Sequence, residues 1–311
     1  MNEPGEIVAS FGTGFLHTTI VRRGEGEYLW TRRPGPDRRD AMPTPADAVL
    51  AAVRALPPGP VAFTLPVTGD GAGLTYRTGQ AGSLAGLLLR GAPGTPGAPD
   101  TAGVADTLEQ TGAALARLHA VPVPRAGLDG PGGPRRLLSW LTGGDGPGAA
   151  ARLHRHAARI LGPGRRAAVE EWCAPGEPHG PRALLHGAPS LGTLLPLTPG
   201  RDGALLTGED LSAGAPESDV GWLVGELVEF RELAGRFGRA TLDHDALIGH
   251  VLDGYGSPLD LAAVGRAATV RFLSHVHDFA AYVRWHDILL DYLEIVAGVI
   301  DAAGAGRLIR R

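Results

Sequence analysis

Lysine is absent from this chain, and all 29 residues of the lysine-plus-arginine count are arginine. Without lysine the chain can form no Schiff base and has no catalytic ammonium group. A phosphate-binding loop that ends in Gly-Lys-Ser or Gly-Lys-Thr is excluded for the same reason. Cysteine is almost absent too, since Cys173 is the only one. A single cysteine forms neither an intrachain disulfide nor a multi-cysteine zinc site.

Long apolar runs are also missing, because no stretch reaches the roughly 18 residues that a membrane-spanning helix needs. The first ten residues, MNEPGEIVAS, do not show the basic-then-apolar order of a signal peptide. The formal net charge of −4 gives no general attraction to nucleic acid or to an anionic membrane. We therefore expect a cytoplasmic protein with neither a nucleic-acid nor a membrane partner.

The composition is that of a folded protein, with 43% hydrophobic and 20% charged residues in a chain of 311. The first 80 residues show short strand-like runs at 7–10, 18–22, 27–31, 61–66 and 73–78, with one helix after Pro45. Beyond residue 82 the apolar spacing becomes helical. The predicted helices cover residues 101–120, 135–142, 148–161, 165–172, 219–237, 243–254, 259–280 and 283–303. The sequence thus predicts an α+β protein with a β-rich lobe at 1–80 and a mainly helical lobe at 81–311.

Two segments between the helical blocks carry a family resemblance. Residues 184–195 read LLHGAPSLGTLL, and residues 205–220 read LLTGEDLSAGAPESDV. Their order and spacing resemble the aminoglycoside phosphotransferase and choline kinase-like family, which reads LxHGDxxxxNxL, then hydrophobic-Asp-[WF]-[ED], then GDPxxDLA. Residues 108–120 resemble the LxxLH helix of that family, residues 30–34 its third strand, and residues 12–15 its nucleotide-covering loop. The resemblance implies the two-lobe fold of the protein kinases.

The residues that such a family uses for chemistry are replaced here. Phosphoryl transfer from ATP needs a carboxylate to orient the acceptor, ligands for Mg²⁺ and a cation on the phosphates. By the resemblance, the catalytic base falls on Ala188, and the two metal-binding positions fall on Thr193 and Thr207. The lysine of the third strand has no counterpart, although Arg32 or Arg33 lies in its neighbourhood. We therefore predict a degenerate pseudokinase with no catalytic residue, no metal ligand and no required cofactor.

Two residues that the family uses to hold the loop in place are retained. By the resemblance, Asp219 braces the catalytic loop through hydrogen bonds, and His186 is structural. The two retained residues stabilise the fold of the lobe, whereas the residues for catalysis are replaced. This contrast supports the pseudokinase prediction.

The function that we predict is a non-catalytic binding, scaffold or allosteric subunit for a partner enzyme or peptide substrate. Bacterial natural-product biosynthesis of the lanthipeptide type is the setting that the resemblance implies. One alternative is an active ATP-dependent phosphotransferase, acting on a small molecule or on peptide Ser/Thr, in which Glu209 or Asp210 takes the metal. Another is a nucleotide sensor that binds ATP without hydrolysing it, with a metal-independent thermal shift as its sign.

Three residues are candidates for contacts to a nucleotide: Gly12, Gly14 and Arg32. The backbone amides at Gly12 and Gly14 could approach an anion. The same two glycines could instead only form a hairpin turn. The paired arginines at 22–23, 32–33 and 38–39 predict a locally basic surface, which could bind a phosphorylated or acidic partner or could simply be solvated.

Overall fold

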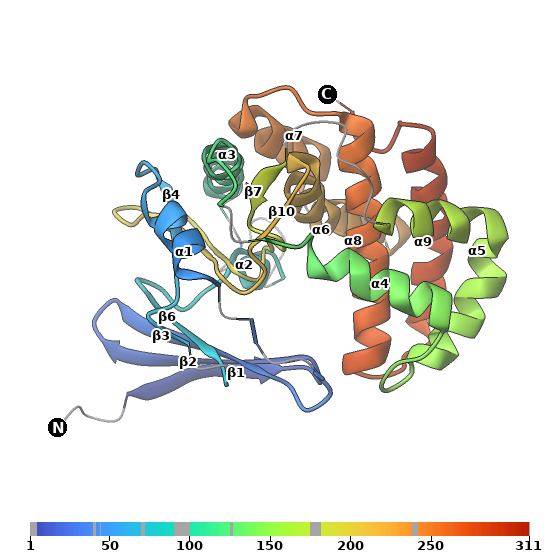
Figure 1. Ribbon diagram of the computed structural model, residues 1–311, viewed down its shortest axis with the longest axis horizontal. Helices are drawn as coiled ribbons and strands as arrows, with labels where there is room; N and C mark the ends of the chain where they lie inside the picture. The colour runs from blue at the N-terminus through green and yellow to red at the C-terminus, as the bar shows by residue number, and fades with distance from the viewer. Residues whose placement is uncertain are drawn as a thin grey trace.

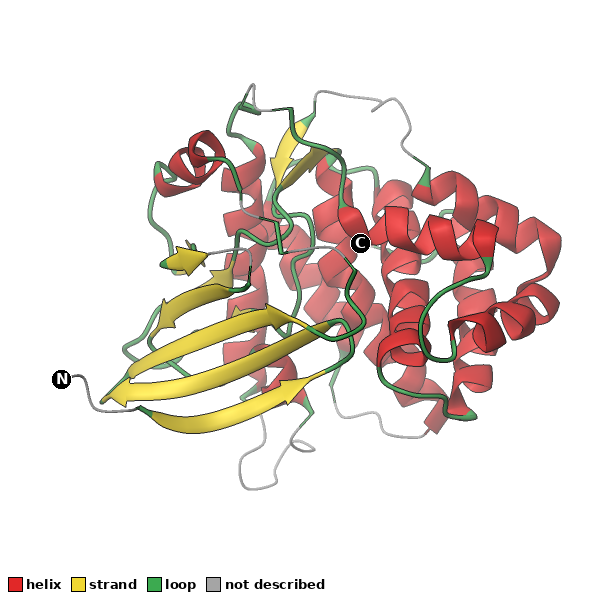
Figure 2. Cartoon of the chain, turned by 60° about the horizontal axis from the view of Figure 1, so that its bottom comes forward, coloured by secondary structure: helices red, strands yellow, loops and turns green. Residues whose placement is uncertain are grey.

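The computed structural model describes residues 5–39, 42–43, 45–69, 72–89, 100–124, 127–174, 182–237 and 242–310. A small lobe built on a twisted β-sheet lies beside a larger lobe of packed helices (Figure 1). Coloured by secondary structure, the long strands gather on one side and most of the helices on the other (Figure 2). The prediction of an α+β protein with a β-rich lobe and a helical lobe is confirmed.

The sheet of the small lobe is antiparallel and has the strand order β1-β2-β3-β6-β5. Alternate side chains of its strands point to one face, where Ile20, Trp30 and Tyr76 are almost fully buried. Leu195 and Leu206 come from later in the chain and complete this cluster. The strands are β1 (Glu6–Gly12), β2 (Leu16–Gly24), β3 (Glu27–Pro34), β5 (Thr68–Gly69) and β6 (Leu74–Thr78).

Two smaller sheets carry the central loops of the molecule. Strand β4 (Val61–Thr64) pairs in parallel with β9 (Gly203–Leu206), which also pairs with β8 (Leu194–Leu195). Strand β7 (Ala183–Leu185) pairs with β10 (Ser212–Gly214). The β4-β9-β8 sheet joins segments from both sides of residue 80, and the division of the chain at that residue stays a prediction.

Helix boundaries follow local chemistry. The side chains of Ser83, Asp100, Asp243 and Asp260 accept backbone N–H groups at the starts of their helices. Among the described residues, no helix is both long and apolar enough to cross a membrane. The helices are α1 (Asp47–Arg54), α2 (Leu84–Leu88), α3 (Thr101–His119), α4 (Gly132–Gly143), α5 (Ala150–Cys173), α6 (Pro216–Phe237), α7 (His244–Tyr255), α8 (Leu261–Tyr282) and α9 (Ile288–Gly304).

Helices α6 and α8 form the centre of the large lobe. They approach closely because α6 carries glycine at 221 and 225, where a side-chain carbon would meet the backbone of α8 near Ala268. Asp219, at the start of α6, is fully buried. This close packing fixes the position of Asp219 beneath the loop that follows β7.

The structure differs from the predicted helices in two places. The predicted helices at 148–161 and 165–172 are two arms of α5, which kinks at Gly162, where φ is 69°, and Pro163. The last predicted helix was wrong at its start, since α8 ends at Tyr282 and α9 begins only at Ile288. A turn separates them, in which Trp285 Nε1 donates to the Asp287 carboxylate at 2.7 Å.

Candidate functional site

Asp219 holds the loop between β7 and β8 from below. Its carboxylate accepts the backbone N–H groups of His186 at 2.6 Å and Gly187 at 2.8 Å. It also lies 3.1 Å from Nε2 of His119, at the end of α3. Three contacts to one buried carboxylate fix the backbone of the loop. The bracing role that the resemblance implied for Asp219 is confirmed.

His186 is part of this support rather than an exposed reactive group. Its Nε2 donates to the carbonyl oxygen of Leu206 at 3.0 Å, and Nδ1 lies 3.4 Å from the amide of Ala188. Burial lowers the pKa of His186, so the ring is neutral. Gly187 has a φ of 91°, and a side chain there would overlap the carbonyl of Asp210. The structural role expected for His186 is confirmed.

The three positions where the resemblance expects the base and the metal ligands are occupied by Ala188, Thr193 and Thr207. Ala188 is partly buried and packs against the core of the large lobe. The hydroxyl of Thr193 donates to the carbonyl of Ser190 at 3.1 Å. Thr207 is 0% exposed, and its hydroxyl donates to the carbonyl of Leu205 at 2.8 Å. Both hydroxyl groups are therefore turned toward the protein's own backbone.

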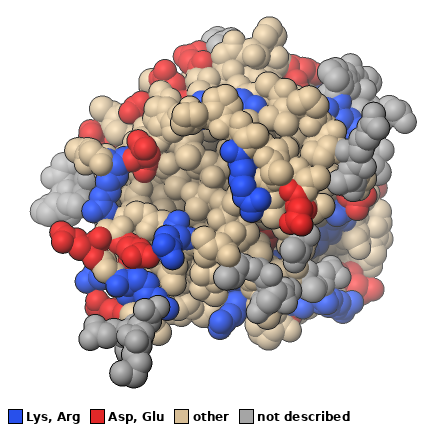
Figure 3. All heavy atoms as spheres, turned by 60° about the vertical axis from the view of Figure 1, so that its left-hand side comes forward, with Lys and Arg blue, Asp and Glu red and all other residues tan. Residues whose placement is uncertain are grey.

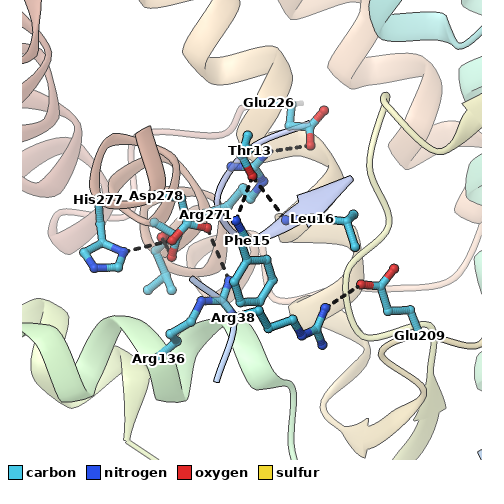
Figure 4. Close-up of polar contacts among 12 residues, drawn as sticks. Thr13, Phe15, Leu16, Arg38, Arg136, Glu209, Glu226, Arg271, His277 and Asp278 are labelled. Carbon is cyan, nitrogen blue, oxygen red and sulfur yellow. Dashed lines mark hydrogen bonds and ion pairs between the residues drawn. The ribbon is translucent and has the colours of Figure 1, made fainter. Parts of the chain in front are cut away.

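Glu209 forms a buried ion cluster with two arginines of the small lobe. Its Oε2 lies 3.1 Å from Nη2 of Arg32, and its Oε1 lies 3.1 Å from Nη1 of Arg38. Figure 4 shows the Arg38 side chain reaching Glu209. Arg38 also contacts the sulfur of Met42 at 3.0 Å. The side chains of Arg32, Arg38 and Glu209 are 15%, 8% and 9% exposed, so this carboxylate is already neutralised inside the protein.

Asp210 is the other carboxylate in this loop, and it is half-buried. Burial raises the pKa of Asp210 to about 6, and the neighbouring Glu209 adds to the rise while Arg136 and the arginines of the small lobe oppose it. In the part of the chain that the structure describes, Asp210 has no ion pair. Nor do three His, Cys, Asp or Glu side chains come together there as a group that could hold a metal.

The loop at residues 12–15 is the turn of the β1–β2 hairpin. Gly12 pairs with His17 across the strands, and the Thr13 hydroxyl accepts the amides of Phe15 at 3.1 Å and Leu16 at 3.2 Å. The N–H of Gly14 donates to the carbonyl of Tyr282 in the large lobe at 2.6 Å. Of the alternatives for Gly12 and Gly14, the hairpin turn is therefore present. Contact of Gly12, Gly14 and Arg32 with a nucleotide stays a prediction. Within the protein, Gly14 already bonds to Tyr282 and Arg32 already pairs with Glu209.

The surface of the small lobe carries less unbalanced positive charge than the paired arginines in the sequence predicted. Arg32 and Arg38 point inward to Glu209, and Arg22 pairs with Glu6 at 3.1 Å. Seen from the side of the small lobe, positive and negative side chains are interspersed over a largely uncharged surface (Figure 3). Sequence reasoning placed Arg38 on this surface and gave no sign of its pairing with Glu209.

Two lobes, a loop braced by a buried aspartate and a hairpin turn over the junction define the kinase-like class of phosphotransferases. The sequence profile of the phosphotransferase enzyme family matches residues 8–256. The chain belongs to this family. None of the curated proteins matches the chain significantly in sequence.

Three solved structures with a similar fold are named as kinases or as members of a kinase family. A choline/ethanolamine kinase family protein from Mesorhizobium loti is 18% identical with a TM-score of 0.50, over 97% of this chain and 87% of that one. Ethanolamine kinase from Plasmodium vivax is 10% identical with a TM-score of 0.53, over 96% and 81%. Amicoumacin kinase, solved with AMP-PNP, Ca²⁺ and Ami, is 10% identical with a TM-score of 0.54, over 96% and 88%. These similarities establish the kinase-like fold.

Proposed function

We propose that this chain is a non-catalytic member of the phosphotransferase enzyme family, a pseudokinase that acts by binding a partner. The observation that carries the proposal is the state of Thr207. At the position where the family resemblance expects a metal-binding aspartate, this side chain is 0% exposed and bonded to the backbone of Leu205. A buried, satisfied hydroxyl is a poor substitute for a carboxylate ligand of Mg²⁺.

The charges of the inter-lobe region support the same proposal. A phosphotransferase uses a cation on the phosphates and carboxylates on the metal ions. Here Arg32 is the candidate for the cation and Glu209 a candidate for a metal-binding carboxylate, but the two side chains form an ion pair with each other. Arg38 forms a second ion pair with Glu209. Ala188 has no side-chain atom that could accept a proton from a substrate hydroxyl. A positioned base typically contributes about 10²–10⁴ in rate, so its loss alone makes turnover slow.

Asp210 favours a second candidate function, an active phosphotransferase with a relocated catalytic group. Its backbone carbonyl lies beside Gly187, next to the position of the missing base, and its half-buried carboxylate lies near Gly132 at the start of α4. A pKa raised by burial to about 6 is suitable for a general base near neutral pH. Glu209 does not share this candidacy, because two guanidinium groups hold it.

Thermal unfolding with ATP, measured with and without Mg²⁺ and combined with an assay for released ADP, separates these functions. We expect no Mg²⁺-dependent shift and no ADP. A ligand at 100 times its Kd would stabilise the protein by about 2.7 kcal/mol, which is readily detected. A shift that needs no Mg²⁺ supports the nucleotide-sensing alternative. A Mg²⁺-dependent shift with ADP release contradicts the pseudokinase, and its loss in Asp210→Asn assigns the activity to that residue.

The partner that we propose is a modifying enzyme or its peptide substrate. Family resemblance supports bacterial peptide-modifying pathways of the lanthipeptide type as the setting. Co-purification with candidate kinase or lyase subunits of such a pathway tests this part of the proposal. We expect a stable complex with one of them, and binding to none of them contradicts the role.

A further inference from the structure

Phe15, at the tip of the β1–β2 hairpin, lies between the two lobes. The guanidinium carbons of Arg38 and Arg136 each lie 4.5 Å from the centre of its ring. The ring of Tyr282 lies 5.0 Å away, at an interplanar angle of 47°. Arg38 belongs to the small lobe, whereas Arg136 and Tyr282 belong to α4 and α8 of the large lobe. One aromatic ring therefore contacts both lobes (Figure 4).

The backbone of the hairpin tip makes the same connection. The N–H of Gly14 donates to the carbonyl of Tyr282 at 2.6 Å, and the carbonyl of Gly14 accepts the N–H of Asp37 at 2.7 Å. A side-chain carbon at position 14 would meet the Asp37 carboxylate, which would have to move aside. Figure 1 shows the hairpin reaching from the small lobe to the end of α8.

Both arginines beside Phe15 keep a carboxylate partner of their own. Arg38 pairs with Glu209 at 3.1 Å, and Arg136 pairs with Asp278 at 3.3 Å. His277 also binds Asp278, with Nδ1 and Oδ1 2.8 Å apart. Burial raises the pKa of Asp278, but Arg136 and His277 outweigh burial and hold it below its ordinary value. If the uncharged ring of Phe15 withdraws, it therefore leaves no unpaired charge behind.

We propose that Phe15 is a latch that holds the small lobe closed against α4 and α8, and that its release opens the junction between the lobes. The attraction comes from the ring face, because a cation over an aromatic ring is held by the quadrupole of the ring. A ligand that reached Arg32 or Gly14 from between the lobes would have to displace the tip that Phe15 anchors. The latch rests on these contacts and does not depend on whether the chain transfers phosphate.

Three variants of the full-length protein test the latch. Phe15→Leu keeps an apolar side chain but removes the ring, and Phe15→Tyr keeps the ring. Phe11→Leu is the matched control, because Phe11 lies on β1 of the same hairpin and is 53% exposed, whereas Phe15 lies in the turn that follows. Amide hydrogen exchange in residues 13–16 reports the Gly14–Tyr282 bond, and small-angle X-ray scattering reports the separation of the lobes.

We expect Phe15→Leu to exchange about tenfold faster in residues 13–16, given the strength of cation–π and aromatic contacts, and to show a larger radius of gyration. Phe15→Tyr and Phe11→Leu should behave as the wild type. If Phe15→Leu matches the wild type in both measurements, or if Phe11→Leu opens the protein equally, the latch is disproved. Detection of ADP release by the wild type would contradict the pseudokinase proposal and leave these expectations unchanged.

Discussion

Arg32 and Glu209 face each other across the two lobes, with Nη2 and Oε2 3.1 Å apart. Arg32 lies on β3, and Glu209 follows β9 at the centre of the molecule. The Glu209 side chain is buried and that of Arg32 is only 15% exposed, so the pair holds the sheet of the small lobe over the loop region. A buried pair of this kind contributes little to stability over an apolar replacement, but removing one partner alone is costly. Replacement of Arg32 or Glu209 alone should therefore destabilise the protein more than the net contribution of the pair suggests.

Glu209→Gln should destabilise the protein by about 3 kcal/mol, because it leaves Arg32 and Arg38 buried without a counter-charge. Urea unfolding at neutral pH measures this difference. Glu27→Gln is the control, since Glu27 pairs with Arg77 at 3.5 Å where both side chains are exposed. Its effect should stay within about 0.5 kcal/mol. Equal losses in the two variants would contradict the burial argument.

The elements of the fold were predictable where local chemistry decides them. Apolar residues at helical spacing in 101–120 predict α3, and the break between 148–161 and 165–172 falls at the Gly162–Pro163 kink of α5. The order of residues in 184–220 located the central loop, and with it the bracing role of Asp219. Each of these signals lies within a few dozen residues of sequence.

The contacts between the lobes were not predictable in this way. Arg38 and Glu209 are 171 positions apart, and no periodicity in either segment indicates that they meet. Phe15 reads as one apolar residue in a Gly-bearing turn, although the fold places its ring beside Arg136 of α4. Such pairs depend on how the lobes dock, so the sequence alone placed Arg38 on a locally basic surface instead.

Asp219→Asn should cost about 2–3 kcal/mol of unfolding free energy. The amide removes the charge and turns an NH₂ donor toward the backbone N–H groups of His186 or Gly187. Chemical denaturation compares it with Asp260→Asn. Asp260 caps α8 through the N–H of Ala262, and asparagine caps a helix as well as aspartate does, so that control should be nearly neutral. A neutral Asp219→Asn would contradict the bracing role.

Ala188→Asp alone should not create turnover. It restores a carboxylate at the position of the base, but Thr207 remains buried and bonded to Leu205, so the metal positions stay empty of carboxylates. A coupled assay for ADP, run with the wild type alongside, should show equal background rates. A rise of about 10² or more, the usual contribution of a general base, would indicate that a metal site already exists elsewhere in the chain.

Cys173 should be unreactive in the folded protein. It is 4% exposed at the end of α5, and burial raises the pKa of its thiol to about 12. At pH 8 only about one thiol in 10⁴ is then ionised, and the thiolate is the reactive form. Labelling with Ellman's reagent should follow the unfolded fraction in urea, and fast labelling in buffer would contradict the burial of this helix end.

Asp210 should make stability depend on pH. Its pKa is about 6 in the folded protein, above the ordinary value of 3.8, because of burial and then the charge of Glu209. Between pH 4 and 6 the folded state therefore binds more protons than the unfolded state, and stability falls as pH rises through this window. Asp210→Asn resembles the protonated form and loses this dependence. The unfolding free energy of Asp210→Asn minus that of the wild type, measured with urea, should increase from pH 4 to pH 6 and stay constant above pH 7. Asp202→Asn, at an exposed position, should run parallel to the wild type. A difference for Asp210→Asn that does not change with pH would mean that this carboxyl group titrates alike in both states.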